Sequence, residues 1–443
     1  MKVRVGTLCS GYDSQCLAME RLKRNFPDFD YELVFWSEFD PESKRPLDKQ
    51  PAVITHNALF PQWADRNVGD MTKADWSKVG EIDLLTYSTP CTDISNAGRQ
   101  AGAEKDSGTR SSIIWHTEKA IRTLQPKYLL MENVASFVSK THIGTFKAWM
   151  ALVESLGYNN FAKVLNATEF GCPQNRERIF VVSIRKDISD KFYFPQPIKL
   201  EKRFKDVLES NVDEKYYLSN ALISSLSRDN KGFKAMKPST PPPHTGVASC
   251  LTARMHKMGR SDNYIMETNI PICLNSKVDG KQPSVQDRIY SIEGCAVAIT
   301  SGWLQNIAEP QVMQVGNIVD DTNIGFKNPQ RGRIYSADGL SPALNCCKGG
   351  GLEPKIVEGE ITSNNLLELV QAGLVRIRKI TPREAFRLMD IEEEYIDVLM
   401  SCGVANTGMY QLAGNSIVVG CLYHIFRKMF VETENENDQL CLF

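Results

Sequence analysis

Residues 86–95, TYSTPCTDIS, place one thiol, Cys91, directly after a proline at the end of an apolar run. A lone cysteine is most often a small buried hydrophobic side chain, so a chemical role for Cys91 depends on its neighbours. Sulfur is strongly nucleophilic, and a usable fraction of thiol groups ionises near pH 7. Cys91 is therefore a candidate nucleophile if other reactive groups gather at the same place.

Glu132 is the second candidate. It lies near the end of KYLLMENV (127–134), a run that is apolar enough to predict a buried strand. Desolvation favours the neutral form of a carboxyl group, which can then act as an acid or a hydrogen-bond donor near neutral pH. The alternative interpretation is an acid that caps a helix.

The segment GCPQNRERIF (171–180) supplies Gln174, Arg176 and Arg178. Alternate residues of a strand point to the same face, so these three side chains are predicted to share one face. Two guanidinium groups and an amide together would bind an oxyanion or a phosphate. Ordinary surface salt bridges are the alternative.

A cofactor site is predicted at the first two strand ends. Gly6 and Gly11 bracket the first strand-to-helix turn, where close backbone approach and a helix N-terminus suit a bound cofactor. Glu38 ends the second strand, where a carboxylate can accept hydrogen bonds from ribose hydroxyls; a solvated loop acid is the alternative. The sequence has neither G-x-G-x-x-G nor G-x-x-x-x-G-K-[ST], which favours a ribose-containing cofactor without phosphate.

These residues need a scaffold that brings strand ends together. From residue 1 to about 190 apolar strand patterns alternate with helical ones, which predicts a mostly parallel α/β sheet covered on both faces. Ligands of such sheets bind beyond the carboxyl ends of the strands. The predicted strands span 3–8, 32–38, 82–87, 127–134, 161–167 and 178–185, and the predicted helices span 111–124 and a segment that ends near Gly157.

Helical patterns return after residue 375. ITPREAFRLM (380–389) has Thr381 as N-cap, Pro382 at the first helical position and Glu384 at the third, which together predict a capping box. A final apolar helix is expected over 416–426. The last residues, ENENDQLCLF, have the composition of an acidic tail.

Between 191 and 374 the composition shifts to Pro, Gly, Ser and Asn with short strand patterns. A weak repeat, GVASCLTA (246–253), GCAVAITS (294–301) and GLSPALNC (339–346), suggests a repeated β unit, and RIYS precedes its last two copies. We therefore expect a catalytic and cofactor-binding domain over 1–190, a smaller β-rich domain over 191–374, and C-terminal helices over 375–443 that complete the first domain.

Composition narrows the choice of partner. The chain has 443 residues and a net charge of −1, so any nucleic-acid face must be local. Residues 231–260 carry six basic residues and no acidic one. No signal peptide or apolar run of membrane-spanning length is present, and no two of the 12 cysteines are spaced C-x-x-C. We expect a cytoplasmic protein with reduced thiols, no metal and no membrane contact.

Taken together, the motifs resemble those of the DNA cytosine-5 methyltransferases. The resemblance covers residues 1–186 and 376–430, and the intervening segment occupies the position of the family's variable target-recognition region. Its motifs are TLCSG (7–11), TPCTDIS (89–95), MENV (131–134), PQNRERIF (173–180), ITPREAFRLM (380–389) and YQLAGNSIVV (410–419).

The resemblance implies a Rossmann-like methyltransferase that uses S-adenosyl-L-methionine and acts on double-stranded DNA. Cys91 would be the nucleophile, Glu132 would engage the cytosine ring nitrogen, and Gln174, Arg176 and Arg178 would support catalysis. The target cytosine would be flipped out of the duplex. The implied cofactor contacts are Leu8, Cys9, Ser10, Gly11, Glu38, Phe39, Asp70, Met71, Ser88, Pro90, Asn415 and Ser416.

The resemblance also implies a prokaryotic or phage-infected cell as the setting, although five positions depart from the family pattern. Cys9 stands where phenylalanine is common, Asp13 and Ser14 replace a usual glycine pair, Thr92 replaces a glutamine, and Phe39 replaces a tryptophan. None of these differences removes a reacting group.

We expect DNA contacts from the basic segment and from the two RIYS motifs, where an arginine could read base edges. The protein is expected to be a monomer, with a cognate restriction endonuclease as a conceivable partner in restriction-modification. An RNA cytosine-5 methyltransferase of the same fold and a non-enzymatic DNA-binding protein are the alternatives; TPPPH (240–244) lacks both ends of an amino-methyltransferase motif. The expected DNA contacts are Lys231, Lys234, Arg254, Lys257, Arg260, Arg288 and Arg333.

Overall fold

The computed structural model divides the chain into two compact units. One contains Met1–Cys172, Arg176–Lys199 and Met389–Phe443, and the other contains Pro173–Asn175 and Leu200–Leu388. The domain limits at 190 and 374 stay a prediction. The structure describes residues 1–90, 107, 110–217, 248–249, 264–268, 314–317, 333–335, 355–356, 359–360 and 375–432.

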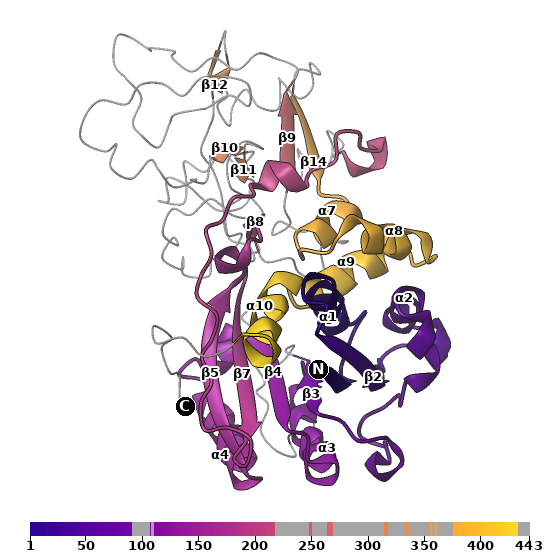
Figure 1. Cartoon of the computed structure of the whole chain (residues 1–443). Coiled ribbons are helices and arrows are strands. Elements are labelled where there is room, and N and C mark those ends of the chain that lie inside the picture. Colours follow the sequence, from indigo (N-terminus) through magenta and orange to yellow (C-terminus); the bar gives the residue numbers. More distant parts are fainter. Residues whose placement is uncertain are drawn as a thin grey trace, which may run out of the picture. The chain divides into compact units, whose positions relative to one another are not determined.

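The first unit is built on a six-stranded sheet with the order β2-β1-β3-β4-β7-β5 (Figure 1). Strands β1, β2, β3 and β4 are parallel, and β7 runs antiparallel to both of its neighbours. The prediction of a mostly parallel α/β sheet is therefore confirmed. The strands are β1 (Lys2–Leu8), β2 (Asp30–Ser37), β3 (Leu84–Tyr87), β4 (Tyr128–Val134), β5 (Tyr158–Asn166) and β7 (Glu177–Arg185).

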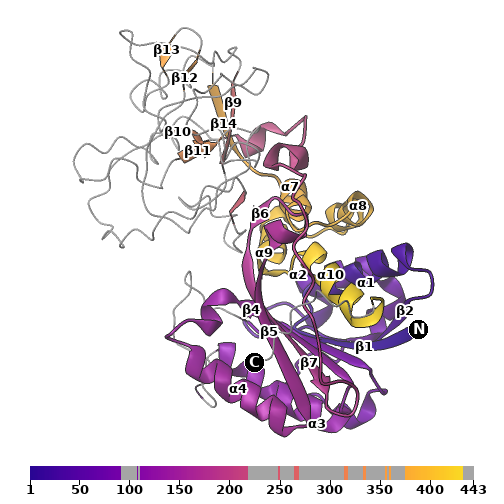
Figure 2. The same cartoon turned by 60° about the vertical axis from the view of Figure 1, so that its left-hand side comes forward.

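Helices lie on both faces of this sheet. Figure 2 shows α3 (Thr117–Leu124) and α4 (Ile143–Ser155) along one face, and α1 (Ser14–Asn25) and α10 (Val419–Phe430) along the other. The helix predicted over 111–124 begins later, because residues 110–116 form a 3-10 turn. The first unit also contains α2 (Pro51–Leu59), α8 (Glu393–Ser401) and α9 (Asn406–Asn415).

The final helix also begins later than predicted. Residues 416–418 form an extended link after α9, and the Val419 amide donates to the Met389 carbonyl oxygen (3.0 Å) as α10 begins. Polar contacts hold α1 to this C-terminal part; among them, Arg21 pairs with Asp390 (2.6 Å), and Asn25 donates to the Tyr423 hydroxyl (3.0 Å).

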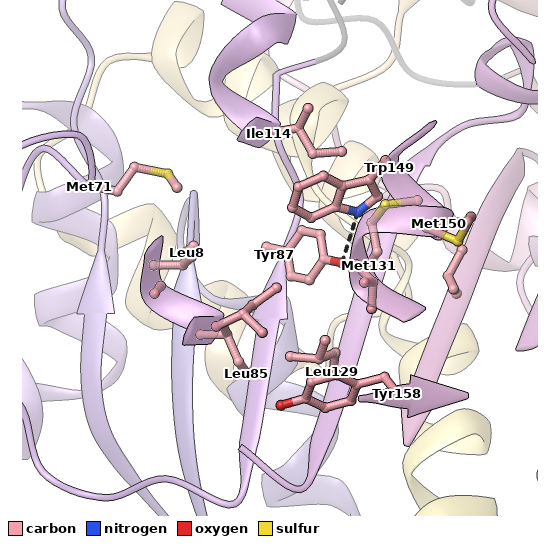
Figure 3. Close-up of a cluster of buried hydrophobic side chains, with 14 of the residues drawn as sticks. Leu8, Met71, Leu85, Tyr87, Ile114, Leu129, Met131, Trp149, Met150 and Tyr158 are labelled. Carbon is pink, nitrogen blue, oxygen red and sulfur yellow. Dashed lines mark hydrogen bonds between the residues drawn. The ribbon is translucent and has the colours of Figure 1, made fainter. Parts of the chain in front are cut away.

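Alternate residues of the parallel strands fill the core between the sheet and α3 and α4 (Figure 3). Leu85 and Tyr87 of β3 lie on the same face, because side chains alternate along a strand. The Trp149 indole of α4 donates to the Tyr87 hydroxyl at 3.2 Å. Burial raises the pKa of Tyr87 above its ordinary value, so the hydroxyl stays neutral.

At the opposite ends of the strands an ion-pair cluster joins three of them. Asp83, directly before β3, accepts from the Arg4 guanidinium at 3.0 Å and lies 2.9 Å from the Lys127 ammonium. Burial opposes the charged form of Asp83, but hydrogen bonds from Arg4 and Lys127 hold its pKa well below the usual range. This cluster aligns β1, β3 and β4 at their amino ends. The candidate site described below lies at their carboxyl ends.

The second unit contains a four-stranded sheet with the order β10-β11-β9-β14. It also contains β6 (Gln174–Asn175), which pairs with β8 (Ala248–Ser249), and the antiparallel pair of β12 (Lys355–Ile356) and β13 (Gly359–Glu360). A β-rich recognition domain over 191–374 stays a prediction. The strands of the larger sheet are β9 (Tyr264–Thr268), β10 (Gln314–Asn317), β11 (Arg333–Tyr335) and β14 (Val375–Lys379).

The predicted capping box is confirmed. Helix α7 (Pro382–Arg387) begins after Thr381, whose hydroxyl accepts from the Glu384 amide while the Glu384 carboxylate accepts from the Thr381 amide. The same carboxylate receives two hydrogen bonds from the Arg378 guanidinium at 2.9 and 3.0 Å, and both side chains are almost fully buried. A local capping motif therefore also carries a buried ion pair.

Within the described residues no helix is both long and apolar enough to cross a membrane. The same part of the chain contains no group of three or more histidine, cysteine, aspartate or glutamate side chains that could hold a metal ion.

Candidate active site and cofactor site

Glu132 lies inside β4 and is 7% exposed. One carboxylate oxygen accepts from the Ser88 hydroxyl at 3.0 Å, and the other lies 3.1 Å from Nε of Arg178. The antiparallel register of β4 and β7 pairs Val134 with Arg178 and so brings the guanidinium to the carboxylate. The prediction of a buried strand acid is confirmed, and the helix-capping interpretation is wrong.

The segment before the candidate nucleophile is held against the same strand. The Asn133 side-chain amide donates to the Thr89 carbonyl (3.3 Å) and hydroxyl (3.4 Å), while its oxygen accepts from the Val134 amide. Strands β3 and β4 are paired neighbours, so Ser88 and Thr89 leave the sheet beside Glu132. Sequence reasoning missed Asn133, although an amide next to a buried acid was a usable signal. Cys91 itself lies outside the described residues.

The described contacts of Gln174, Arg176 and Arg178 differ, and the shared oxyanion or phosphate grip stays a prediction. Gln174 donates to the Leu388 carbonyl, and Nη2 of the buried Arg176 donates to the carbonyls of Gly414 (3.0 Å) and Ser416 (2.6 Å). The chain leaves one strand after residue 175 and enters β7 at 177, so the three residues do not lie on one unbroken strand. Arg178 pairs with Glu132.

The first loop, after β1, has an unusual backbone. Cys9, Gly11 and Asp13 all have positive φ angles of 52°, 59° and 71°, a region that non-glycine residues rarely occupy. The Gly11 amide donates to the Glu38 carboxylate at 2.7 Å, and Sγ of Cys9 lies 3.8 Å from Sδ of Met71. The structure thus brings together predicted cofactor residues from three segments: the first loop, the end of β2 with Glu38, and the segment that contains Met71.

The remaining predicted cofactor residues border these loops. The carboxylate of Asp70 accepts from both the amide and the hydroxyl of Thr72. Burial opposes its charge, but these bonds and Lys73 hold the pKa of Asp70 below its ordinary value. Leu8 is buried at the end of β1, Phe39 is 38% exposed, Pro90 is half-buried, Asn415 is exposed at the end of α9, and Ser416 is half-buried.

Tyr12 joins the first loop to the segment after α9. Its hydroxyl donates to the Ser416 hydroxyl, and burial raises the pKa of Tyr12, which keeps the phenol protonated. Sequence reasoning did not single out this residue, because its partner lies about 400 positions away in the chain.

The residues present fit an adenosine-containing ligand. The Glu38 carboxylate can accept hydrogen bonds from ribose hydroxyls. The buried Ser10 hydroxyl has no hydrogen-bond partner in the part of the chain that the structure describes, and such a group is normally satisfied by protein, water or ligand. The aromatic face of Phe39 offers a stacking surface.

The predicted DNA contacts stay untested. Arg333 begins β11. The others lie outside the described residues: Lys231, Lys234, Arg254, Lys257, Arg260 and Arg288.

The sheet order and the loops after β1 and β2 define an α/β fold of the methyltransferase type, and solved structures share it. An Entamoeba histolytica methyltransferase, EhMeth, has a TM-score of 0.55 at 14% identity, with 97% of this chain and 98% of that chain covered. A Spodoptera frugiperda DNMT2 mutant has a TM-score of 0.53 at 15% identity, with 97% and 99% covered. At these identities the likeness concerns the fold alone.

The family follows from the sequence comparison. The model of C-5 cytosine-specific DNA methylases matches residues 3–431, so the chain belongs to this family and is a DNA cytosine-5 methyltransferase. Type II methyltransferase M2.ScrFI of Lactococcus lactis subsp. cremoris is 31% identical over 83% of this chain and 71% of its own length. Orphan methyltransferase M.SPRI of Bacillus phage SPR is 27% identical over 98% of this chain and all of its own length.

Proposed function

We propose that the protein methylates carbon 5 of a flipped cytosine in a specific sequence of double-stranded DNA, with S-adenosyl-L-methionine as methyl donor and Cys91 as covalent nucleophile. The observation that carries this proposal is the buried Glu132 carboxylate between Ser88 and Arg178, on the strand next to the one that leads to Cys91. The family membership fixes the reaction class, and the site supports these roles.

In the proposed mechanism the Cys91 thiolate adds to carbon 6 of the ring, and the electrons of the carbon 5–carbon 6 double bond become available at carbon 5. Glu132 holds ring nitrogen 3 and stabilises the charge that develops there. Arg178 and Ser88 fix the carboxylate through different oxygens, and each oxygen keeps a second lone pair that can face the ring.

When bound, S-adenosyl-L-methionine supplies an electrophilic methyl group. Glu38 would hold its ribose, and the backbone of the loop with Ser10 and Gly11 would border the amino-acid part. After transfer, a base removes the proton from carbon 5, the electrons of that C–H bond reform the double bond, and the Cys91 thiolate leaves. We assign no residue to this base.

For DNA we propose contacts from the basic segment 231–260 and from the two RIYS arginines, because six basic residues without an acid suit a phosphate backbone. The relatives include both a type II and an orphan methyltransferase by name. Two biological settings are therefore open for this enzyme: it acts beside a cognate restriction endonuclease, or it acts without one.

One experiment tests the substrate. The chain is expressed in a bacterium without cytosine methylation, and 5-methylcytosine is mapped across its DNA, with Cys91→Ser as control. We expect one short sequence to be modified at every occurrence with the wild type and none with the variant. Purified enzyme that methylates transfer RNA and leaves DNA unmodified would favour the RNA alternative and contradict the proposal.

A further inference from the structure

Helix α2 contacts both loops that we assign to the cofactor. At its start, the side chain of Gln50 accepts from the Asp40 amide (2.8 Å) and donates to the Asp40 carbonyl (3.3 Å), and Gln50 is 3% exposed. Asp40 follows Glu38 and Phe39 directly. The start of α2 is therefore fixed to the second cofactor loop by two partly buried hydrogen bonds.

Further along, α2 turns His56 toward the first cofactor loop. Nε2 of His56 lies 3.6 Å from Oδ2 of Asp13, and both side chains are completely buried. Oδ2 also accepts from the Thr7 hydroxyl at 2.8 Å, and Oδ1 accepts from the Cys16 amide at 3.1 Å, which caps α1. Asp13 thus joins the end of β1, the loop, the start of α1 and α2.

The Asp13 carboxylate is a polar group that faces Nε2 of His56. Neither ring nitrogen has a hydrogen-bond partner in the described part of the chain, and a buried polar atom without a partner is costly. The ring stacks on Trp36 with centroids 3.6 Å apart and an interplanar angle of 14°. The indole face therefore fixes the plane of the imidazole and keeps Nε2 beside the Asp13 carboxylate.

The position of Asp13 makes this pair relevant to the ligand. Asp13 has a φ of 71°, and the family usually has a glycine pair where this chain has Asp13 and Ser14. Glycine adopts such a conformation freely, whereas an aspartate needs side-chain contacts to keep it. The hydrogen bonds from Thr7 and Cys16, together with the approach of His56, supply those contacts here.

We propose that His56, stacked on Trp36 with Nε2 facing the Asp13 carboxylate, is a positioning residue that holds the first loop in its cofactor-binding conformation. This inference rests on the proposed use of S-adenosyl-L-methionine. It implies that the pair affects cofactor affinity and leaves the chemical step unchanged, because neither side chain belongs to the group around Glu132.

The test compares His56→Phe, which keeps the stacked ring and loses both ring nitrogens, with Asp13→Asn, which keeps the size and loses the carboxylate. Calorimetry with S-adenosyl-L-methionine and with S-adenosyl-L-homocysteine should show a dissociation constant about tenfold higher for each variant. The double variant should be no weaker than the weaker single one, because each substitution removes the same pair. The methylation rate at saturating cofactor should stay within about twofold.

Thr55→Val is the matched control, since Thr55 is a fully buried polar residue of the same helix whose hydroxyl bonds only to carbonyls of α2 in the described contacts. It should lower the melting temperature and leave cofactor affinity unchanged. A His56→Phe variant that melts earlier but binds the cofactor as tightly as the wild type would overturn the inference.

Wild-type protein that binds neither S-adenosyl-L-methionine nor S-adenosyl-L-homocysteine would instead contradict the proposed function.

Discussion

Replacing Glu132 with glutamine tests the role of the buried carboxylate. The amide keeps the size of the side chain, and its oxygen can still accept from Arg178, which lies 3.1 Å from the carboxylate. Ser88, 3.0 Å from the other oxygen, can reverse its hydroxyl and accept from the new NH₂ group. The variant should therefore fold, and the substitution removes only the exchangeable acid and the negative charge.

The expected loss is at least ~10²-fold in the rate of methyl transfer, the usual range for a lost acid–base group. This corresponds to about 2.7 kcal/mol of transition-state stabilisation. Single-turnover transfer of a tritiated methyl group to DNA gives the rate, and calorimetry with S-adenosyl-L-homocysteine should show unchanged cofactor affinity.

Glu177→Gln is the control, because it makes the same chemical change at an exposed position of β7. It should behave as the wild type. A Glu132→Gln enzyme that keeps its chemical rate and loses cofactor affinity would refute the reasoning and move Glu132 to the cofactor site.

Four further outcomes are expected. DNA with 5-fluorocytosine at the target should form an irreversible complex with the wild type but not with Cys91→Ser, because fluorine cannot leave as a proton does; a serine variant that methylates at the wild-type rate would contradict this. Arg378→Met leaves the buried Glu384 without its charge partner and should lower the free energy of urea unfolding by ~3–5 kcal/mol; a loss below about 1 kcal/mol would argue against a charged pair. The folded-state pKa of Asp83 is depressed, so its ion pairs stabilise above an unfolded-state pKa of about 3.9 and this contribution is lost as pH falls. Asp83→Asn should therefore destabilise the protein at pH 7 but progressively less as the pH drops below about 4, and a pH-independent effect would contradict the ion-pair explanation. Moving residues 191–374 onto a related enzyme should transfer the methylated sequence, and a chimera with unchanged specificity would place recognition elsewhere.

Local features of the fold were predictable from the sequence. The capping box at Thr381 and Glu384 needs residues only three positions apart, and the strand that carries Glu132 is marked by its own apolar run. Capping and burial preferences act over a few residues, so they can be recognised in the sequence without knowing the fold.

Contacts between distant segments were not predictable in the same way. The hydrogen bond from Gly11 to Glu38 and the approach of His56 to Asp13 depend on how loops meet above the sheet. The relation between Gln174 and Arg176 could not be settled from their spacing, because period-two alternation holds only within an unbroken strand and the chain leaves one strand after residue 175. Cys91 was identified from its motif, and its geometry lies outside the described residues.

The division of the first unit between the two ends of the chain has a consequence for synthesis. Helix α1 forms from the first 25 residues, whereas α10, which packs against it, is made last. The ribosome must first translate residues 200–388, which takes roughly 10–40 s at ~5–20 residues per second. During that interval the apolar side of α1 that α10 later covers stays exposed to solvent or to chaperones. The enzyme can therefore complete its first unit only after nearly the whole chain, including residues 200–388, has been made, and nascent chains that stop before Met389 should aggregate.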